Sequence, residues 1–264
     1  MGVKIFPGRS QSLEKTLYEK QIEAGIITLS NDRRSFMLRL FLLLLASIGP
    51  GLLWLWYFYK QDRYEPEPLR IVLKIFLAGL ILVVPAGLME QIWRGQILSA
   101  VRTGNWPSFL VMAFLVIALI EESLKTGFLW WLVGNNRELD EPVDGIIYGI
   151  TLGLGFASLE NLLWASAFGF GVAALRAVIT TLAHATFTGW MGFFIARYKF
   201  RTHSYLTLFS GFLLAWASHG CYDFLLFLRR PAASLIAFLL IAVLLFRLYH
   251  IIQKEVAHSP FRNQ

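Results

Sequence analysis

Two adjacent glutamates, Glu121 and Glu122, stand inside the apolar stretch LVIALIEESLKTGFLWWLVG. A charged side chain at the centre of a membrane-spanning helix costs about 2.5–3.5 kcal/mol on insertion scales, so such residues are rare unless they face a polar interior. Glu121 and Lys125 are four positions apart, so they share a helix face and can pair. Glu122 points about 100° away. We therefore expect one carboxylate to be held as a structural ion pair while the other titrates.

The next three apolar stretches also carry polar side chains at mid-span depth. They are Glu160, Asn161, His184, His219 and Asp223. His219 and Asp223 are four positions apart, so the carboxylate can orient the imidazole and fix its tautomer. Each of these groups also has a structural explanation, as a buried ion pair or an interhelical hydrogen bond. However, four consecutive stretches each offer at least one, which favours convergence on a single cavity.

A carboxylate with two histidines is typical of hydrolysis, by either of two mechanisms. In the first, a buried glutamate acts as general base on water, and a histidine with a polar side chain stabilises the oxyanion. In the second, His184, His219 and Glu122 bind zinc, whose bound water becomes the nucleophile. The sequence has no His-Glu-x-x-His motif, so the zinc ligands would come from three helices. The cofactor therefore stays open: none for a glutamic enzyme, zinc for a metalloprotease.

The elements that must hold these groups are membrane-spanning helices. The 264 residues are 56% apolar and only 16% charged, which is too apolar for an ordinary soluble domain. Crossing a hydrocarbon core of about 30 Å takes about 20 apolar residues. Long apolar stretches lie at 36–58, 71–93, 108–134, 143–170, 173–197, 205–228 and 232–252. The predicted fold is an all-α polytopic transmembrane bundle of about seven spanning helices.

No linker divides these stretches, so we expect one integral membrane domain at 36–253. A polar N-terminal flank at 1–35 and a polar C-terminal tail at 254–264 complete the chain. The net charge of +7 is best explained by Lys and Arg at helix ends near lipid headgroups, so the bilayer and not nucleic acid is the expected partner. Basic residues are balanced between the two sides of the bundle, which leaves the membrane orientation open.

Small residues mark the fourth stretch as a packing helix. They recur every four positions at Gly145, Gly149, Gly153 and Ala157. Such a face lets a neighbouring helix approach closely, so we expect this helix to lie centrally in the bundle. The last stretch has no ionisable residue before Arg247 and is expected to be peripheral. Asp144 and Arg176 lie near helix ends and are expected to be interfacial.

Four short motifs follow one another over roughly residues 50–228. They are DRYEPEPLR in a loop, EESLK, the glycine-rich DGIIYGITLGLGFASLEN, and HGCYDF. Together they resemble the PrsW family of intramembrane proteases. The loop resembles a family hallmark, EESLK resembles its Glu-Glu-x-x-Lys element, the third its glycine-rich helix ending in Glu-Asn, and the fourth its His-Gly-x-Tyr-Asp-Phe element. Four motifs in the right order make the resemblance specific.

The resemblance implies an endopeptidase that cuts a membrane-anchored protein. The family precedent is an anti-sigma factor in a bacterial stress cascade, which implies a single-span membrane protein as substrate and the bacterial plasma membrane as location. The family is also similar to the CAAX prenyl endopeptidases and other membrane glutamic proteases. That likeness implies Glu121 or Glu122 as base, His184 as assisting histidine, and His219 with Asp223 as the last pair.

The sequence departs from the wider group at two positions. Lys125 stands one position closer to the glutamates than the group's basic residue, and Asp223 replaces an asparagine of the oxyanion site. An ionised carboxylate would repel an oxyanion, so we expect Asp223 to orient His219, leaving donation to the histidine or to Asn161. Lys125 and Glu160 are further supporting residues. The family has also been described as metalloproteases.

The residues taken alone allow two other functions. Intramembrane Glu, His and Lys side chains also build the proton relays of a proton-coupled transporter. Against transport, the glycine-rich stretch has no counterpart elsewhere, so no inverted repeat is visible. A third interpretation is a non-catalytic scaffold or immunity protein. Proteolysis by Glu-to-Gln variants separates this last interpretation from an enzyme, and flux into liposomes tests the transporter.

Overall fold

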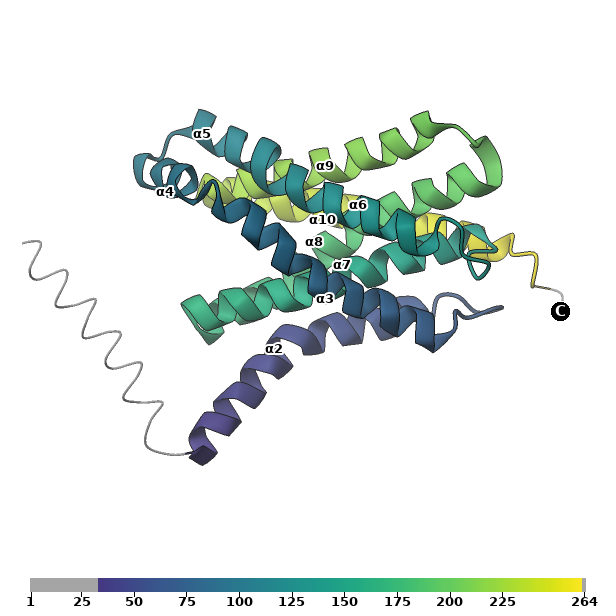
Figure 1. Cartoon of the computed structure of the whole chain (residues 1–264), viewed down its shortest axis with the longest axis horizontal. Coiled ribbons are helices and arrows are strands. Elements are labelled where there is room, and N and C mark those ends of the chain that lie inside the picture. The colour runs from purple at the N-terminus through teal and green to yellow at the C-terminus, as the bar shows by residue number, and fades with distance from the viewer. Residues whose placement is uncertain (1–32, 263–264) are drawn as a thin grey trace, which may run out of the picture. The chain divides into compact units, whose positions relative to one another are not determined.

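The computed structural model describes residues 33–262, in which the regular elements are all helices (Figure 1). They are α2 (Arg33–Tyr59), α3 (Leu69–Gln91), α4 (Arg94–Thr103), α5 (Trp106–Val111), η1 (Met112–Ala118), α6 (Leu119–Val133), α7 (Pro142–Phe168), α8 (Phe170–Arg197), η2 (Tyr198–Thr202), α9 (Tyr205–Phe227) and α10 (Pro231–Ala257). The segments η1 and η2 are π-helical. The predicted all-α fold is confirmed.

Six helical segments of the described chain are long and apolar enough to cross a membrane. They are Phe36–Tyr59, Leu69–Gln91, Trp106–Val133, Pro142–Phe168, Val178–Thr202 and Pro231–Ala257. The remaining predicted span corresponds to α9, which has 23 residues. It carries Ser218, His219 and Asp223, whose polar side chains lower its hydropathy. A bundle of about seven spanning helices therefore describes the chain well.

The chain divides into two compact units, Met1–Leu44 and Leu45–Gln264. The described part of the first is the beginning of α2, an apolar helix with exposed side chains. The predicted polar flank at 1–35 lies outside the described residues except for positions 33–35, which already belong to α2. At the other end, α10 continues to Ala257, past the expected boundary at 253. The second unit contains every predicted site residue.

Helix α7 is the central helix of the second unit, packed between α3 and α8. A Cβ on Gly149 would overlap the carbonyl oxygen of Thr188, and one on Gly153 would overlap that of His184. Only glycine lets the two backbones approach so closely. The predicted central position of this helix is confirmed, whereas α10 is mostly exposed, as expected of a peripheral helix.

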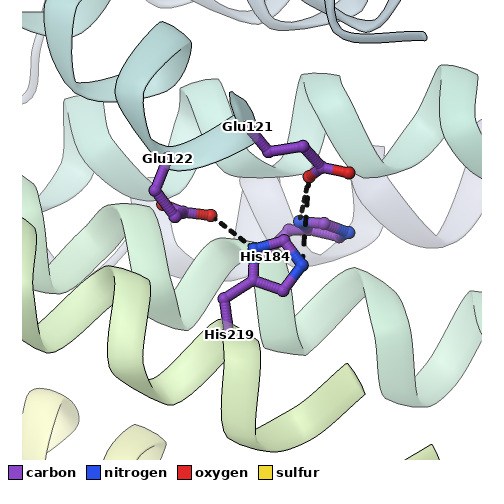
Figure 2. Close-up of side chains that lie close together, drawn as sticks. All are labelled: Glu121, Glu122, His184 and His219. Carbon is purple, nitrogen blue, oxygen red and sulfur yellow. Dashed lines mark hydrogen bonds and ion pairs between the residues drawn. The ribbon is translucent and has the colours of Figure 1, made fainter. Parts of the chain in front are cut away.

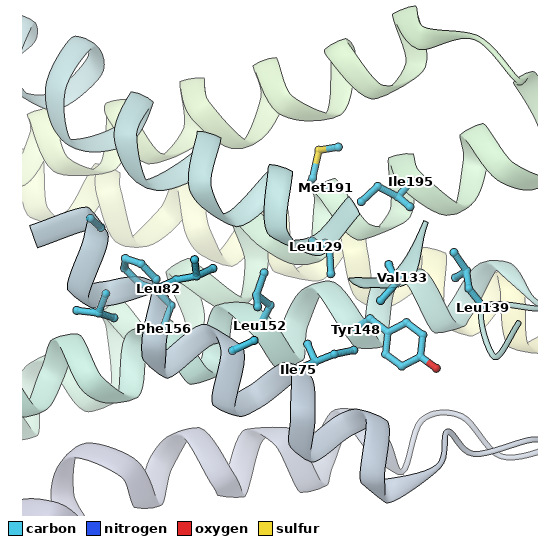
Figure 3. Close-up of a cluster of buried hydrophobic side chains, with 13 residues drawn as sticks. Ile75, Leu82, Leu129, Val133, Leu139, Tyr148, Leu152, Phe156, Met191 and Ile195 are labelled. Carbon is cyan, nitrogen blue, oxygen red and sulfur yellow. The ribbon is translucent and has the colours of Figure 1, made fainter. Parts of the chain in front are cut away.

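A buried apolar cluster joins α3 and α6 to α7 (Figure 3). Ile75 and Leu82 of α3 and Leu129 of α6 lie around Leu152 and Phe156 of α7. Between membrane-spanning helices such contacts act through van der Waals packing, and close packing holds the cluster rigid. The cluster therefore fixes α6, which carries the two glutamates, against the central helix.

The π-helical segment η1 runs directly into α6. Widening the helix frees a backbone carbonyl, and the indole Nε1 of Trp216 in α9 donates a hydrogen bond to the carbonyl oxygen of Phe114 at 2.7 Å. The two rings also meet edge to face, with centroids 5.6 Å apart. Short π-helical segments often occur at functional sites. Here the hydrogen bond connects η1, which directly precedes the helix of Glu121, to α9, the helix of His219.

Candidate active site

Four predicted site residues meet inside the second unit (Figure 2). Glu121 and Glu122 from the start of α6 face His184 of α8 and His219 of α9, and we call these four the Glu/His cluster. Each offers one ligand-type atom, and these atoms all lie within 4.8 Å of one another. The four side chains are at most 5% exposed. The predicted convergence is confirmed for these residues.

Lys125 lies among these four side chains and is itself fully buried. Its Nζ donates to Glu122 Oε1 at 2.7 Å and lies 3.1 Å from Glu121 Oε2. The expectation that lysine pairs with only one glutamate was therefore wrong. Positions three and four residues before Lys125 both lie on its side of the helix, and the long lysine stem reaches both carboxylates.

His184 is fixed by a carboxylate on the central helix. Its Nε2 lies 2.8 Å from Glu160 Oε2, while its Nδ1 lies 3.1 Å from Lys125 Nζ. A carboxylate only accepts and an ammonium only donates, so Nε2 carries the proton and Nδ1 accepts from lysine. The predicted supporting residue Glu160 thus determines which nitrogen of His184 faces the Glu/His cluster.

Glu160 is in turn held by Arg176 of α8. The guanidinium donates to Glu160 Oε1 at 2.5 Å and to Asn161 Oδ1 at 3.2 Å. Arg176 is therefore not merely interfacial, as the sequence suggested. Asn161 also donates from Nδ2 to Thr181 at 2.9 Å. Since its oxygen accepts from Arg176 and one of its two N–H groups donates to Thr181, Asn161 serves as a link between α7 and α8.

Both ring nitrogens of His219 face carboxylates. Nδ1 lies 2.8 Å from Glu122 Oε1, and Nε2 lies 3.3 Å from Asp223 Oδ2 and 4.0 Å from Glu121 Oε2. The predicted contact with Asp223 is confirmed. Phe187 stacks on the ring with centroids 5.1 Å apart, which fixes its plane. Both ring nitrogens therefore face hydrogen-bond acceptors.

The two glutamates occupy different environments. Glu122 is fully buried, and its Oε1 is shared by Lys125 and His219. Glu121 Oε2 faces both imidazoles, 3.8 Å from His184 Nδ1 and 4.0 Å from His219 Nε2. Although Lys125 is close, this oxygen accepts no well-formed hydrogen bond from any residue in the described part of the chain. Glu122 Oε2 also lacks a partner there, but only the Glu121 oxygen faces both histidines.

The donor atoms fit a zinc ion by type. Two imidazoles and a carboxylate are a common catalytic zinc set, bound at about 2.0–2.2 Å. The place that a zinc ion would take between these donor atoms is filled by the Lys125 ammonium. Its Nζ lies 2.7 Å from Glu122 Oε1 and 3.1 Å from both Glu121 Oε2 and His184 Nδ1. A cation already occupies the centre of the donor set. As arranged, these residues bind an ammonium group and not a metal.

One acidic residue near the Glu/His cluster was missed by the sequence analysis. Glu90, at the end of α3, lies within electrostatic reach of Glu121, Glu160 and Asp223, and its Oε1 has no partner among the described residues. A carboxylate next to a predicted helix end is usually interfacial, so its position gave no reason to single it out. Only the packing of α3 on α6 and α7 places it here.

Comparison with known proteins gives one consistent result. The family model of the PrsW family intramembrane metalloproteases matches residues 67–249. Protease PrsW of Geobacillus kaustophilus (strain HTA426) is 38% identical over 193 residues, which cover 72% of this chain and 82% of that protein. Protease PrsW of Bacillus subtilis (strain 168) is 35% identical over 191 residues, covering 71% and 84%. No solved structure matches.

A more distant relative shows the same coverage. Protease PrsW of Clostridioides difficile (strain 630) is 31% identical over 214 residues, which cover 78% of this chain and 87% of that protein. The family match spans α3 to α10 and so contains the whole Glu/His cluster with Lys125. The protein is accordingly an integral membrane protease, and not the transporter or the scaffold that its residues alone allowed. Its buried glutamates and histidines lie within the matched region, and the chain belongs to the PrsW family of intramembrane proteases.

Proposed function

We propose that the Glu/His cluster hydrolyses a peptide bond of a single-span membrane protein, with Glu121 as the general base. The observation that carries this proposal is Glu121 Oε2, a buried oxygen that faces both imidazoles, lies 3.1 Å from the Lys125 ammonium and accepts no well-formed hydrogen bond from the described residues. A general base needs an oxygen free to take a proton from water. Glu122 is a poorer candidate, because its Oε1 is shared by Lys125 and His219.

The proposed reaction is direct attack by water. Glu121 takes a proton from the water while the water oxygen bonds to the carbonyl carbon of the peptide. The same proton then passes from Glu121 to the leaving amine as the C–N bond breaks. Lys125 and the imidazole of His219 supply positive charge for the oxyanion of the tetrahedral intermediate. His184, with Nε2 bound to Glu160, accepts from Lys125 through Nδ1 and so holds the ammonium in place beside Glu121.

The proposed substrate is a membrane-anchored protein with a single span, an anti-sigma-type regulator being the family precedent. The Glu/His cluster belongs to apolar helices, so the scissile bond must come to the same depth. A peptide bond inside a helix is shielded by the helix's own hydrogen bonds. The substrate helix must therefore unwind locally beside α6, α8 and α9 before Glu121 can act on it.

Cleavage of defined substrates tests the proposal. The full chain in liposomes would be incubated with a panel of single-span proteins, including anti-sigma-type regulators, and products identified by mass. His184→Ala and His219→Ala should each lower the cleavage rate by at least about 100-fold. His250→Ala is the matched control, since this exposed imidazole contacts a carbonyl oxygen and the Phe246 ring of its own helix and lies outside the Glu/His cluster. Equal cleavage by all three variants would refute a role for the two buried histidines.

Chelation distinguishes the two hydrolytic mechanisms. Because the Lys125 ammonium occupies the cation position, we expect cleavage to continue when a zinc chelator is added. If chelation abolished cleavage and zinc restored it, Lys125 would have to leave the centre of the site. His184, His219 and Glu122 would then hold the metal, which would supply an activated water. That result would place the chain with the metal-dependent enzymes that its family description names.

A further inference from the structure

A second group of carboxylates lies at the opposite end of α7 from Glu160. Asp62 and Glu67 belong to the loop between α2 and α3, Glu141 precedes α7, and Asp144 lies in its first turn; we call these four the acidic cluster. One oxygen each from Asp62, Glu141 and Asp144 lies within 4.8 Å of the other two. Asp144 and Glu160 are separated by about 24 Å along the helix. The acidic cluster is therefore distinct from the proposed active site.

These carboxylates are buried and poorly satisfied. All four side chains are at most 3% exposed. Both oxygens of Asp62, Oε1 of Glu67 and Oδ1 of Asp144 accept no hydrogen bond within residues 33–262. The other oxygens of two of them are engaged: Glu67 accepts from the Tyr148 hydroxyl, and Asp144 accepts from the backbone of Glu141 at 2.7 Å. Unpartnered oxygens on Asp62, Glu67 and Asp144 thus face other carboxylates from adjoining segments.

The nearby lysine does not neutralise this charge. The Lys199 ammonium donates instead to the carbonyl oxygens of Asn136 and Leu139 at 2.8 and 2.6 Å. Negative charge at these positions is therefore costly unless a cation offsets it.

Ligands that are all carboxylate oxygens suit a hard divalent cation. Hard divalent cations bind oxygen ligands, and Ca²⁺ does so at about 2.3–2.6 Å, which puts opposite ligands about 4.8 Å apart. The three carboxylate oxygens of the acidic cluster fall within that span. Mg²⁺ is smaller and usually keeps several of its waters. Burial of all four side chains leaves a hydrated ion little room, which favours Ca²⁺.

We propose that Asp62, Glu141 and Asp144, with Glu67 beside them, bind a hard divalent cation, Ca²⁺ in preference to Mg²⁺. Bound there, the ion ties the loop before α3 to the beginning of α7. Because α7 carries Glu160 and packs closely on α8, this attachment also supports the helix pair that positions His184. The cation is therefore structural, and its binding should be visible as stabilisation of the whole fold, independent of any catalytic assignment.

Thermal unfolding of the full chain in detergent tests the site. Bound metals would first be removed with EDTA, and the EDTA then removed by buffer exchange. CaCl₂ should raise the unfolding midpoint saturably by about 5 °C or more, and MgCl₂ should raise it less. Asp62→Asn should abolish the Ca²⁺ shift. In EDTA the same variant should unfold at or above the wild-type midpoint, because one like charge has been removed. A purely structural role for the carboxylate would instead lower that midpoint.

Matched variants separate this site from others. Asp140→Asn changes an exposed carboxylate one position before Glu141 and should keep the full Ca²⁺ shift. His184→Ala should also keep it, which excludes binding at the Glu/His cluster. Asp144→Asn should lose it, like Asp62→Asn, and isothermal titration of Asp62→Asn with CaCl₂ should show no heat of binding. The absence of a Ca²⁺ shift in wild type, or its persistence in Asp62→Asn, would overturn the proposal.

Discussion

Glu121 and Glu122 are adjacent residues of the same type, but their side chains make different contacts. Glu122 Oε1 accepts from Lys125 and lies 2.8 Å from His219, so it compensates the buried ammonium and holds the imidazole in place. Glu121 Oε2 has no well-formed hydrogen bond among the described residues and faces two imidazoles. The difference comes from which helices pack on each face of α6. It could not be read from the sequence, where the two positions are equivalent.

Removal of the central ammonium should be costly. Lys125→Met leaves two buried carboxylates without compensation, and breaking a buried ion pair from one side costs about 3–5 kcal/mol. We expect a large fall in the unfolding midpoint in detergent. Adding Glu122→Gln should restore part of it, because the uncompensated charge is then removed; a double-mutant cycle measures this coupling. Purely additive effects of the two changes would contradict the paired arrangement.

Arg176 should act through Glu160 and His184 and not on the substrate. Arg176→Gln releases Glu160, so the imidazole of His184 loses its fixed orientation. Loss of such an orienting contact typically costs about 10–100-fold in activity, which we expect in kcat with little change in KM. Arg201→Gln is the control, since Arg201 pairs with Glu255 instead. A change in KM alone would argue for direct substrate contact.

Helix α7 positions the site because glycine brings α8 close to it. Gly149 and Gly153 face the backbone carbonyls of Thr188 and His184, so this crossing also places the histidine. The four-residue spacing of small residues predicted the close approach. The sequence could not say which helix approaches, because the same helix uses Gly155 against Phe76 of α3 on its other side.

Glycine-to-alanine changes at two positions should distinguish the effect of close helix packing from the effect of helix propensity. Gly153→Ala would push against the carbonyl of His184, and overpacking of this kind typically costs about 1–3 kcal/mol. The unfolding midpoint should fall, and cleavage should fall with it. Gly127→Ala in α6 meets nothing within 4 Å and should be neutral or stabilising, by up to about 1 kcal/mol from helix propensity. Equal effects of the two changes would contradict the close crossing.

Most helices were predictable from hydropathy, but the π-helical geometry of η1 was not. The apolar stretches predicted the spans at Leu69–Gln91 and Pro231–Ala257 closely. The helix that carries His219 is not among the segments of the described chain that are apolar enough to cross a membrane by composition alone, and it carries polar groups of the site. Nothing in MAFLVIA marks η1 as π-helical, since that geometry depends on Trp216, 102 positions later in the chain. Long-range contacts decide such local distortions.

At the scale of the whole molecule, two buried polar clusters lie at different levels of one central helix. The Glu/His cluster could be anticipated, because charged residues at mid-span depth are conspicuous in an apolar sequence. The acidic cluster could not, because Asp62 and Glu67 belong to a loop far in sequence from Glu141 and Asp144. Resemblance alone singled out the loop DRYEPEPLR. Its packing against the start of α7 gives a physical reason for its acidic residues.

The central claim is that Glu121 activates water for peptide hydrolysis while Glu122 maintains the site. The most direct measurement compares Glu121→Gln with Glu122→Gln in one preparation, by cleavage rate of a single-span substrate and by unfolding midpoint. Glu121→Gln should lower the midpoint less than Glu122→Gln does, because it removes only the longer contact with Lys125, and should lose about 10²–10⁴-fold in rate. Glu122→Gln should lower the midpoint as well, since Lys125 and His219 both lose a charged partner. Cleavage by Glu121→Gln at the wild-type rate would contradict the account.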